Sequence, residues 1–122
     1  SNQKERRNVM IPAGSLTWLL GYMCAGVMSE GYYLAIGAVR FKQAVYNEGT
    51  YNLYLAGASS PTSAAENYFA ANGTSKPANA QHLQVVGVFH TNELRNIQLS
   101  MYSTYKIELE SVNLHVVRLR AD

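Results

Sequence analysis

The chain has 122 residues, of which 48% are hydrophobic and 15% are charged, and its formal net charge is +2 at pH 7. This length holds one domain with one core, and the apolar fraction is typical of packed globular proteins rather than of disordered chains. The small net charge argues against a nucleic-acid surface. The sequence also lacks the roughly twenty consecutive apolar residues that would predict a membrane-spanning helix.

The first residues, Ser1 to Asn8, are polar and charged. They predict either a frayed arm or the last turns of a helix from an upstream stalk. Ser1 is not a natural start, so the chain is expected to be part of a longer protein. Residues 9–122 are expected to form a single β-sandwich head domain. Alternating apolar residues predict a strand over Ser15 to Met23, and Cys24 is expected to be a buried, unreactive thiol.

The next two predicted strands form a hairpin. Tyr32 to Tyr46 is rich in β-forming residues, Asn47-Glu48-Gly49 is a turn signal, and Tyr51 to Leu55 returns as the second strand. The apolar residues of the first strand change parity near Gly37, which predicts a bulge or a corner there. They are Leu34 and Ile36 on one parity, and Val39, Phe41 and Val45 on the other.

The segment from Gly57 to Gln81 lacks strand periodicity and is rich in small polar residues, with two prolines as breakers. Thr62 or Ser63 against Glu66 is a capping signal that predicts one short helix through Ala71. The remainder is predicted to be a long loop. Loops of this length inside compact domains are often functional, so the recognition surface is expected between residues 58 and 81.

The last part of the chain alternates apolar and polar residues. His82 to His90 is predicted to be a strand with Val85, Val86 and Val88 buried on both sides. Three further short strands, separated by turns at Tyr102-Ser103-Thr104 and Glu110-Ser111, are expected to follow as an antiparallel meander. Their apolar residues are Ile97, Leu99 and Met101, then Tyr105, Ile107 and Leu109, then Val112, Leu114 and Val116.

These segments together predict the fold class. Eight or so strands, one long crossing loop and at most one short helix are typical of an all-β antiparallel sandwich, and we expect the jelly-roll type. The low charge and the nine tyrosines of the chain have two explanations. A partner covers part of the surface, or tyrosine is frequent only because it suits strands.

The acidic and histidine residues give no pattern that predicts catalysis. Glu108 and Glu110 share one strand face, opposite to the apolar residues, and are expected to face solvent rather than to form a glycosidase pair. No Gly-x-Ser-x-Gly motif occurs, and His82 and His90 lie too far apart along one strand to bind one ion. His115 is expected at the surface, with a position at a subunit axis as the alternative. We therefore expect no enzyme, no metal and no cofactor.

Four residues are candidates for ligand binding: Trp18, Tyr68, Asn72 and Thr74. The two aromatic side chains offer stacking surfaces, and the two polar side chains offer hydrogen bonds. Asn72-Gly73-Thr74 also matches a glycosylation acceptor, although Asn-Gly is first of all a turn signal. Packing within the core or at an interface is the other explanation for the aromatic residues. Further candidates for stacking are Tyr22, Tyr32, Tyr33 and Tyr54.

The segment Glu48-Gly49-Thr50-Tyr51-Asn52-Leu53-Tyr54-Leu55 resembles a hairpin strand in the globular heads of the tumour-necrosis-factor and complement-head superfamily. The likeness extends in strand rhythm from Val9 to Leu119, with Val112 to Leu119 as the final strand. The resemblance implies a trimeric jelly roll of ten strands, a design that viruses also use as knobs on fibres and tail needles. The family contributes no catalytic residues.

We therefore expect a non-enzymatic trimeric knob of a phage or viral fibre, spike or tail needle. It would act on a virion or outside the cell by attaching to a host-surface receptor or glycan. The alternative is a carbohydrate-binding β-sandwich module. The two hypotheses differ in oligomeric state, because only the knob requires a homotrimer.

Overall fold

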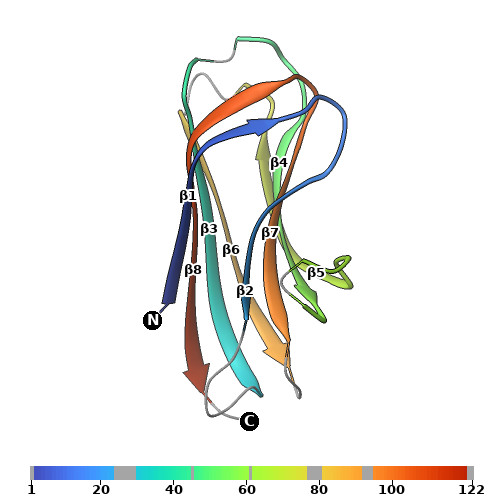
Figure 1. The fold of residues 1–122 in the computed structure, drawn as a ribbon, viewed down its shortest axis with the longest axis vertical. Helices are drawn as coiled ribbons and strands as arrows, with labels where there is room; N and C mark the ends of the chain where they lie inside the picture. The colour runs from blue at the N-terminus through green and yellow to red at the C-terminus, as the bar shows by residue number, and fades with distance from the viewer. Residues whose placement is uncertain are drawn as a thin grey trace.

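The computed structural model describes residues 2–23, 30–44, 46–60, 62–76, 81–91 and 95–120. These residues form eight strands and no helix. The strands are β1 (Asn2–Ile11), β2 (Thr17–Met23), β3 (Gly31–Phe41), β4 (Tyr51–Ala58), β5 (Asn67–Thr74), β6 (His82–Thr91), β7 (Asn96–Ser103) and β8 (Ile107–Arg120). Two four-stranded sheets lie face to face, as Figure 1 shows.

We name these sheets A, with strand order β1-β8-β3-β6, and B, with strand order β2-β7-β4-β5. All strand pairs are antiparallel. Most consecutive strands lie in opposite sheets, so the chain crosses repeatedly from one sheet to the other, which is compatible with a jelly roll. The predicted all-β antiparallel sandwich is therefore confirmed. The predicted meander is wrong, because β7 belongs to sheet B and β8 to sheet A.

The hydrophobic core lies between the two sheets and follows the period-two alternation of the strands. Ile97, Leu99 and Met101 on β7 are fully buried, as their pattern predicted. Ile107 and Leu109 on β8 also belong to the core. Burial of these side chains supplies the main stabilisation of the sandwich.

β3 departs from the predicted change of parity near Gly37. The burial of β3 alternates along its whole length, with no change of parity near Gly37. Leu34 and Ile36 therefore point away from the core, on the outer face of sheet A, while Val39 and Phe41 point into it. A strand that carries apolar residues on both faces produces the same sequence pattern as a bulged strand with one apolar face.

β8 runs through the break that was predicted to separate two strands at Glu110-Ser111. Its pairing with β3 shifts by one residue between Arg40 and Phe41, so the break is a β-bulge within one strand. A bulge and a turn both change the parity of the apolar residues, and the sequence does not distinguish them.

The N-terminal residues also differ from the expectation of a frayed arm or a helix end. Residues 2–11 form β1, an edge strand of sheet A that pairs with β8 from Asn2 to Ile11. Asn8 has a positive φ of 55°, and the pairing steps over it between Arg7 and Val9. The charged residues of this segment therefore belong to a paired edge strand, where charge protects against aggregation.

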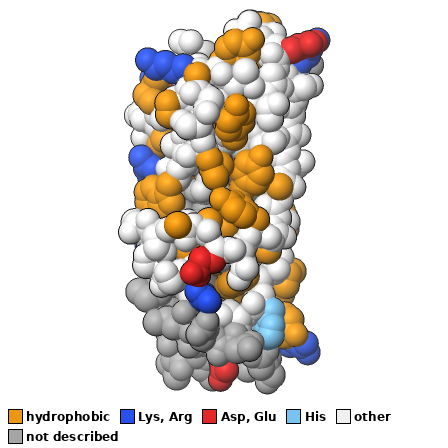
Figure 2. All heavy atoms as spheres, turned by 90° about the vertical axis from the view of Figure 1, so that its right-hand side faces the viewer, with side chains coloured by type: hydrophobic (Ala, Val, Ile, Leu, Met, Phe, Trp, Pro, Cys, Tyr) orange, Lys and Arg blue, Asp and Glu red, His pale blue; other side chains and the backbone are white. Residues whose placement is uncertain are grey.

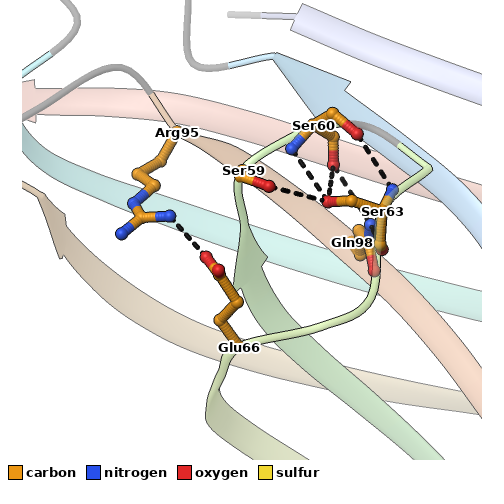
Figure 3. Close-up of polar contacts among 6 residues, drawn as sticks. All are labelled: Ser59, Ser60, Ser63, Glu66, Arg95 and Gln98. Atoms are coloured by element: carbon orange, nitrogen blue, oxygen red, sulfur yellow. Dashed lines mark hydrogen bonds and ion pairs between the residues drawn. The ribbon is translucent and has the colours of Figure 1, made fainter.

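The predicted helix over residues 62–71 is wrong, because Asn67–Thr74 is the edge strand β5 of sheet B. Ser63, one of the two residues expected to cap this helix, instead forms a turn with Ser60. Ser60 Oγ accepts a hydrogen bond of 2.9 Å from the Ser63 backbone N–H, and Ser63 Oγ accepts one of 3.0 Å from the Ser60 N–H (Figure 3). Each serine side chain thus accepts from the backbone N–H of the other and closes the turn, and the chain then continues into the edge strand β5 rather than into a helix.

The turn is held on the outer face of sheet B by Gln98 on β7 and by Arg95, which immediately precedes β7. Gln98 Nε2 donates to the backbone oxygens of Ser60 and Ser63, at 3.2 and 2.7 Å. Arg95 forms an ion pair with Glu66 beside it (Figure 3). Residues 59, 60 and 62–66 thus cover one end of this face, where Gln98 is buried.

Some sequence predictions fall on residues that the structure does not describe. Cys24, Val45 and the side chain of Tyr22 lie outside the described residues. Within the described part of the chain, no helix is long and apolar enough to span a membrane.

Candidate functional site

The outer face of sheet B carries a groove, which we call the stacking groove. It has a volume of about 470 Å³ and is lined by Leu16, Tyr54, Tyr68, Ala70, Ala71 and Tyr102. Figure 2 shows hydrophobic side chains gathered at the middle of this face. All six lining residues are uncharged, so the groove suits a neutral ligand with an apolar surface.

The three tyrosines run diagonally across three neighbouring strands. Tyr102 lies on β7 opposite Asn52, Tyr54 lies on β4 two residues further along, and Tyr68 lies on β5 opposite Ala56. Tyr54 points outward because Leu53 and Leu55 point into the core. The small side chain of Ala71, directly opposite Tyr54, leaves the hollow between the rings.

Tyr54 is held from two sides. Its ring and the Tyr68 ring form a T-shaped pair with a centroid distance of 5.9 Å and an interplanar angle of 77°. Asn52 Nδ2 donates a hydrogen bond of 3.1 Å to the Tyr54 hydroxyl. Tyr68 remains 53% exposed and offers its surface to solvent. Tyr54 is therefore an ordered wall of the groove, and Tyr68 is its accessible ring.

Trp18 lies on the same face, on β2, which β7 separates from β4. It pairs with Ser100 on β7, which in turn pairs with Tyr54, so Trp18 and Tyr54 flank Ser100. The indole is 39% exposed, and the Arg6 guanidinium lies 5.8 Å from its ring centroid. The structure thus brings Trp18 and Tyr68, two of the four predicted binding residues, to one face.

A second, polar hollow adjoins the stacking groove. It is lined by Gly49, Thr50, Asn52, Gly73, Thr74 and Ser75, and has a volume of about 390 Å³. Asn52 connects the two, because its side chain lines the polar hollow and holds Tyr54 in the groove. A Cβ on Gly73 would overlap the Asn52 amide, so this glycine makes room for the connection. The predicted residue Thr74 belongs to this polar hollow.

The fourth predicted residue, Asn72, has a different position. It pairs with Leu53, whose side chain points into the core, and its Nδ2 donates a 2.8 Å hydrogen bond to the Gln84 backbone oxygen on β6. Asn72 therefore ties the edge strand of sheet B to the edge strand of sheet A. Its amide has a structural partner that the sequence did not predict.

The outer face of sheet A has its own distinct feature, an apolar patch. Leu34 on β3 lies between Val88 on β6 and Val117 on β8, and Ile36 lies beside Val86. Val86 is 49% exposed and Val88 is 53% exposed. The prediction that Val86 and Val88 are buried is thus wrong for the isolated chain, because these two residues face outward.

The acidic and histidine residues singled out from the sequence lie on the outer face of sheet A. Glu108 pairs with Lys42 at 3.2 Å, and Glu110 lies 3.7 Å from Arg40, so both face outward as predicted. The described residues contain no group of three or more potential metal ligands. His90 stacks on another ring of the outer face of sheet A rather than facing His82.

The remaining candidate aromatic residues lie in different parts of the sandwich. Tyr33 belongs to the core, and Tyr32 stacks on His90 at a centroid distance of 4.3 Å on sheet A. Tyr54 reaches the stacking groove. Tyr102 was missed because it was assigned to a turn, although its parity along β7, opposite to that of Met101, indicates an outward position. His115 lies half-buried on the outer face of sheet A, opposite Ile36.

No protein-family model matches the chain, and no curated protein matches it at a significant level. We therefore infer function from the two outer faces of the sandwich.

Proposed function

We propose that the protein is a non-enzymatic homotrimeric knob that attaches a phage or viral fibre, spike or tail needle to a host surface. The observation that carries this proposal is the apolar patch on the outer face of sheet A. A sheet with one solvated face normally alternates apolar and polar residues, whereas β3 and β6 carry apolar residues on both faces at the patch. Such a face is stable in water when a partner covers it.

The surroundings of the patch support copies of the same chain as this partner. Polar and charged residues border it, among them Gln84, Asn113 and the Arg40–Glu110 pair. An apolar centre with a polar rim is the usual composition of a protein interface. Glu5, Glu108 and Glu110 on this face are each already paired with a basic residue, so two copies meet without strong repulsion between like charges.

The size of the face also suits a subunit interface. Four strands about 4.8 Å apart, each about ten residues long at about 3.3 Å per residue, cover about 600 Å² in projection. Because side chains protrude from the sheet, the accessible area of this face is larger than its projected area and approaches the roughly 800 Å² per partner of a standard interface. The two-sheet sandwich, compatible with a jelly roll, agrees with a head of the tumour-necrosis-factor type on a virion or outside the cell. A monomeric carbohydrate-binding module is the alternative.

Oligomeric state tests this proposal directly. We expect sedimentation velocity to give a trimer at micromolar concentration, and the double variant Val86→Lys/Val88→Lys to sediment as a monomer. Both positions are half-exposed, so the lysines disturb the assembled face rather than the core. The dissociation constant should rise at least about a hundredfold, because charges would be buried in an apolar interface.

The control variant is Tyr46→Lys, which changes an 82% exposed aromatic residue outside both sheets and should leave the assembly unchanged. Should the lysine variant not fold, as judged by circular dichroism, Val86→Thr/Val88→Thr keeps β-branched residues in the strand and should still weaken association. A wild-type monomer would overturn the knob and favour the monomeric module. A trimer that survives both variants would show that another surface joins the subunits.

A further inference from the structure

We infer that the outer face of sheet B is a binding site for a neutral glycan, with the stacking groove receiving one sugar ring and the polar hollow receiving its neighbour. This inference rests on the proposed attachment function and names the chemical class of the surface ligand. It depends on the geometry of sheet B and not on the number of subunits.

The first argument is the division of the site into an apolar and a polar half. A pyranose ring has an apolar face of C–H groups that stacks on aromatic rings, and hydroxyl groups around its edge that need hydrogen-bond partners. The stacking groove offers the ring of Tyr68 against the fixed ring of Tyr54. The polar hollow offers the side chains of Asn52 and Thr74. The pattern of the two hollows therefore matches the amphipathic surface of a carbohydrate.

The second argument is that the two halves are adjacent and in register. Asn52 and Tyr54 are alternate residues on β4, so their side chains leave the same face about 6.6 Å apart. The hydrogen bond between them fixes their relative orientation before any ligand arrives. A site that is ordered in advance loses less conformational entropy on binding.

The third argument is charge. No Asp, Glu, Lys, Arg or His is among the residues that line the stacking groove or the polar hollow. A strongly anionic or cationic ligand would therefore lack a partner for its charge within these hollows. Neutral hexoses and N-acetylated sugars fit this lining.

A proline-rich peptide is the main competing occupant of an aromatic groove. The polar hollow favours the glycan, because a polyproline helix buries little besides apolar rings and backbone carbonyls. The tyrosines also run diagonally across the strands, on the face of the sheet. A peptide that extends the sheet by backbone pairing would bind along a strand edge instead.

The test is a neutral-glycan array with the wild-type chain, followed by titration calorimetry with the strongest oligosaccharide. We expect Tyr68→Ala to weaken binding about tenfold or more, because the sugar loses the accessible ring on which it stacks. Asn52→Ala should also weaken binding, because it removes a polar group from the polar hollow and the hydrogen bond that orients Tyr54 in the stacking groove. Tyr46→Ala is the matched control, because it removes an exposed tyrosine outside the site.

The outcomes separate this inference from the proposed knob. A wild-type chain that trimerises but binds no neutral glycan, or binds one equally well after Tyr68→Ala, overturns the glycan site and leaves the knob standing. Glycan binding that is lost in Tyr68→Ala and kept in Val86→Lys/Val88→Lys supports the site whatever the oligomeric state. Binding of a proline-rich peptide library at Tyr68, without glycan binding, assigns the groove to a peptide and also overturns the inference.

Discussion

Single residues determine the geometry of the candidate site through contacts that lie beneath its surface. Gly73 leaves space for the Asn52 amide, and Asn52 orients the Tyr54 hydroxyl. The accessible ring of Tyr68 then forms a T-shaped pair with Tyr54. The shape of the stacking groove therefore depends on a glycine and an asparagine as much as on its tyrosines.

Tyr51 is the residue whose ionisation the fold perturbs most clearly among the described residues. Burial raises the pKa of the Tyr51 phenol above its usual value of 10.0, and the nearby Tyr105 contributes in the same direction. The hydroxyl donates a 2.8 Å hydrogen bond to the Asn47 backbone oxygen. The neutral form is thus favoured in the folded state, and its contribution to stability is complete below pH 10.

We expect Tyr51→Phe to lower the free energy of unfolding by about 1 kcal/mol at neutral pH, through loss of this hydrogen bond. Because the pKa is raised in the folded state, the wild type should lose stability as the pH rises above 10, towards the folded pKa. The variant should lose less over the same range. Urea denaturation at pH 7 and at several values above pH 10 measures this difference, and identical slopes for both proteins would contradict it.

At the scale of elements, the segment 59–66 shows how a short turn replaces a helix. The exchange of bonds between Ser60 and Ser63 closes the turn, and Gln98 fastens it to β7 (Figure 3). Glu66 N–H then donates to the Gly57 oxygen at 2.9 Å, which leads the chain into β5. The turn therefore sets where the edge strand carrying Tyr68 begins.

Gln98→Ala should lower the free energy of unfolding by about 1–3 kcal/mol, because the Ser60 and Ser63 carbonyl oxygens lose a buried partner. The same change should increase hydrogen exchange across residues 59–66 more than in the rest of sheet B. Ser59→Ala is the control, since it removes only an exposed hydroxyl contact. Equal exchange in the variant and the wild type would show that the turn is stable without Gln98.

At the scale of the whole molecule, the two ends of the chain are paired. β1 covers the edge of β8 in sheet A, and Figure 1 shows these two strands side by side. Arg6 also reaches across to sheet B, where it donates a 2.6 Å hydrogen bond to the Leu19 oxygen. The first residues of the chain thus join the sheets, although their composition suggested a peripheral arm.

Deletion of residues 1–8 should therefore lower the melting temperature by several degrees and expose an unpaired edge of β8 to aggregation. Differential scanning calorimetry and light scattering on the shortened chain measure both effects. The double substitution Gln3→Thr/Lys4→Arg keeps both the strand and its charges and serves as the control. An unchanged melting temperature after deletion would favour the interpretation of residues 1–8 as a frayed arm.

The sequence by itself determined the strand class and much of the core, because a period of two follows from the backbone of any β-strand. Ile97, Leu99 and Met101 were assigned to the core for this reason, and they are buried. The period does not distinguish a bulge from a turn, as at Glu110-Ser111, or an apolar outer face from a buried one, as at Val86. The local sequence pattern therefore does not predict features that depend on pairing with strands distant in the chain.

The candidate site was decided by the tertiary structure. Tyr68 and Trp18 were recognised from their residue type, but Tyr102, Tyr54 and Tyr68 meet only because β7, β4 and β5 are neighbours in sheet B. Their register comes from hydrogen bonds between residues far apart in the chain, which one sequence does not encode locally. The same pairing turned Asn72 towards β6, because its partner Leu53 faces the core.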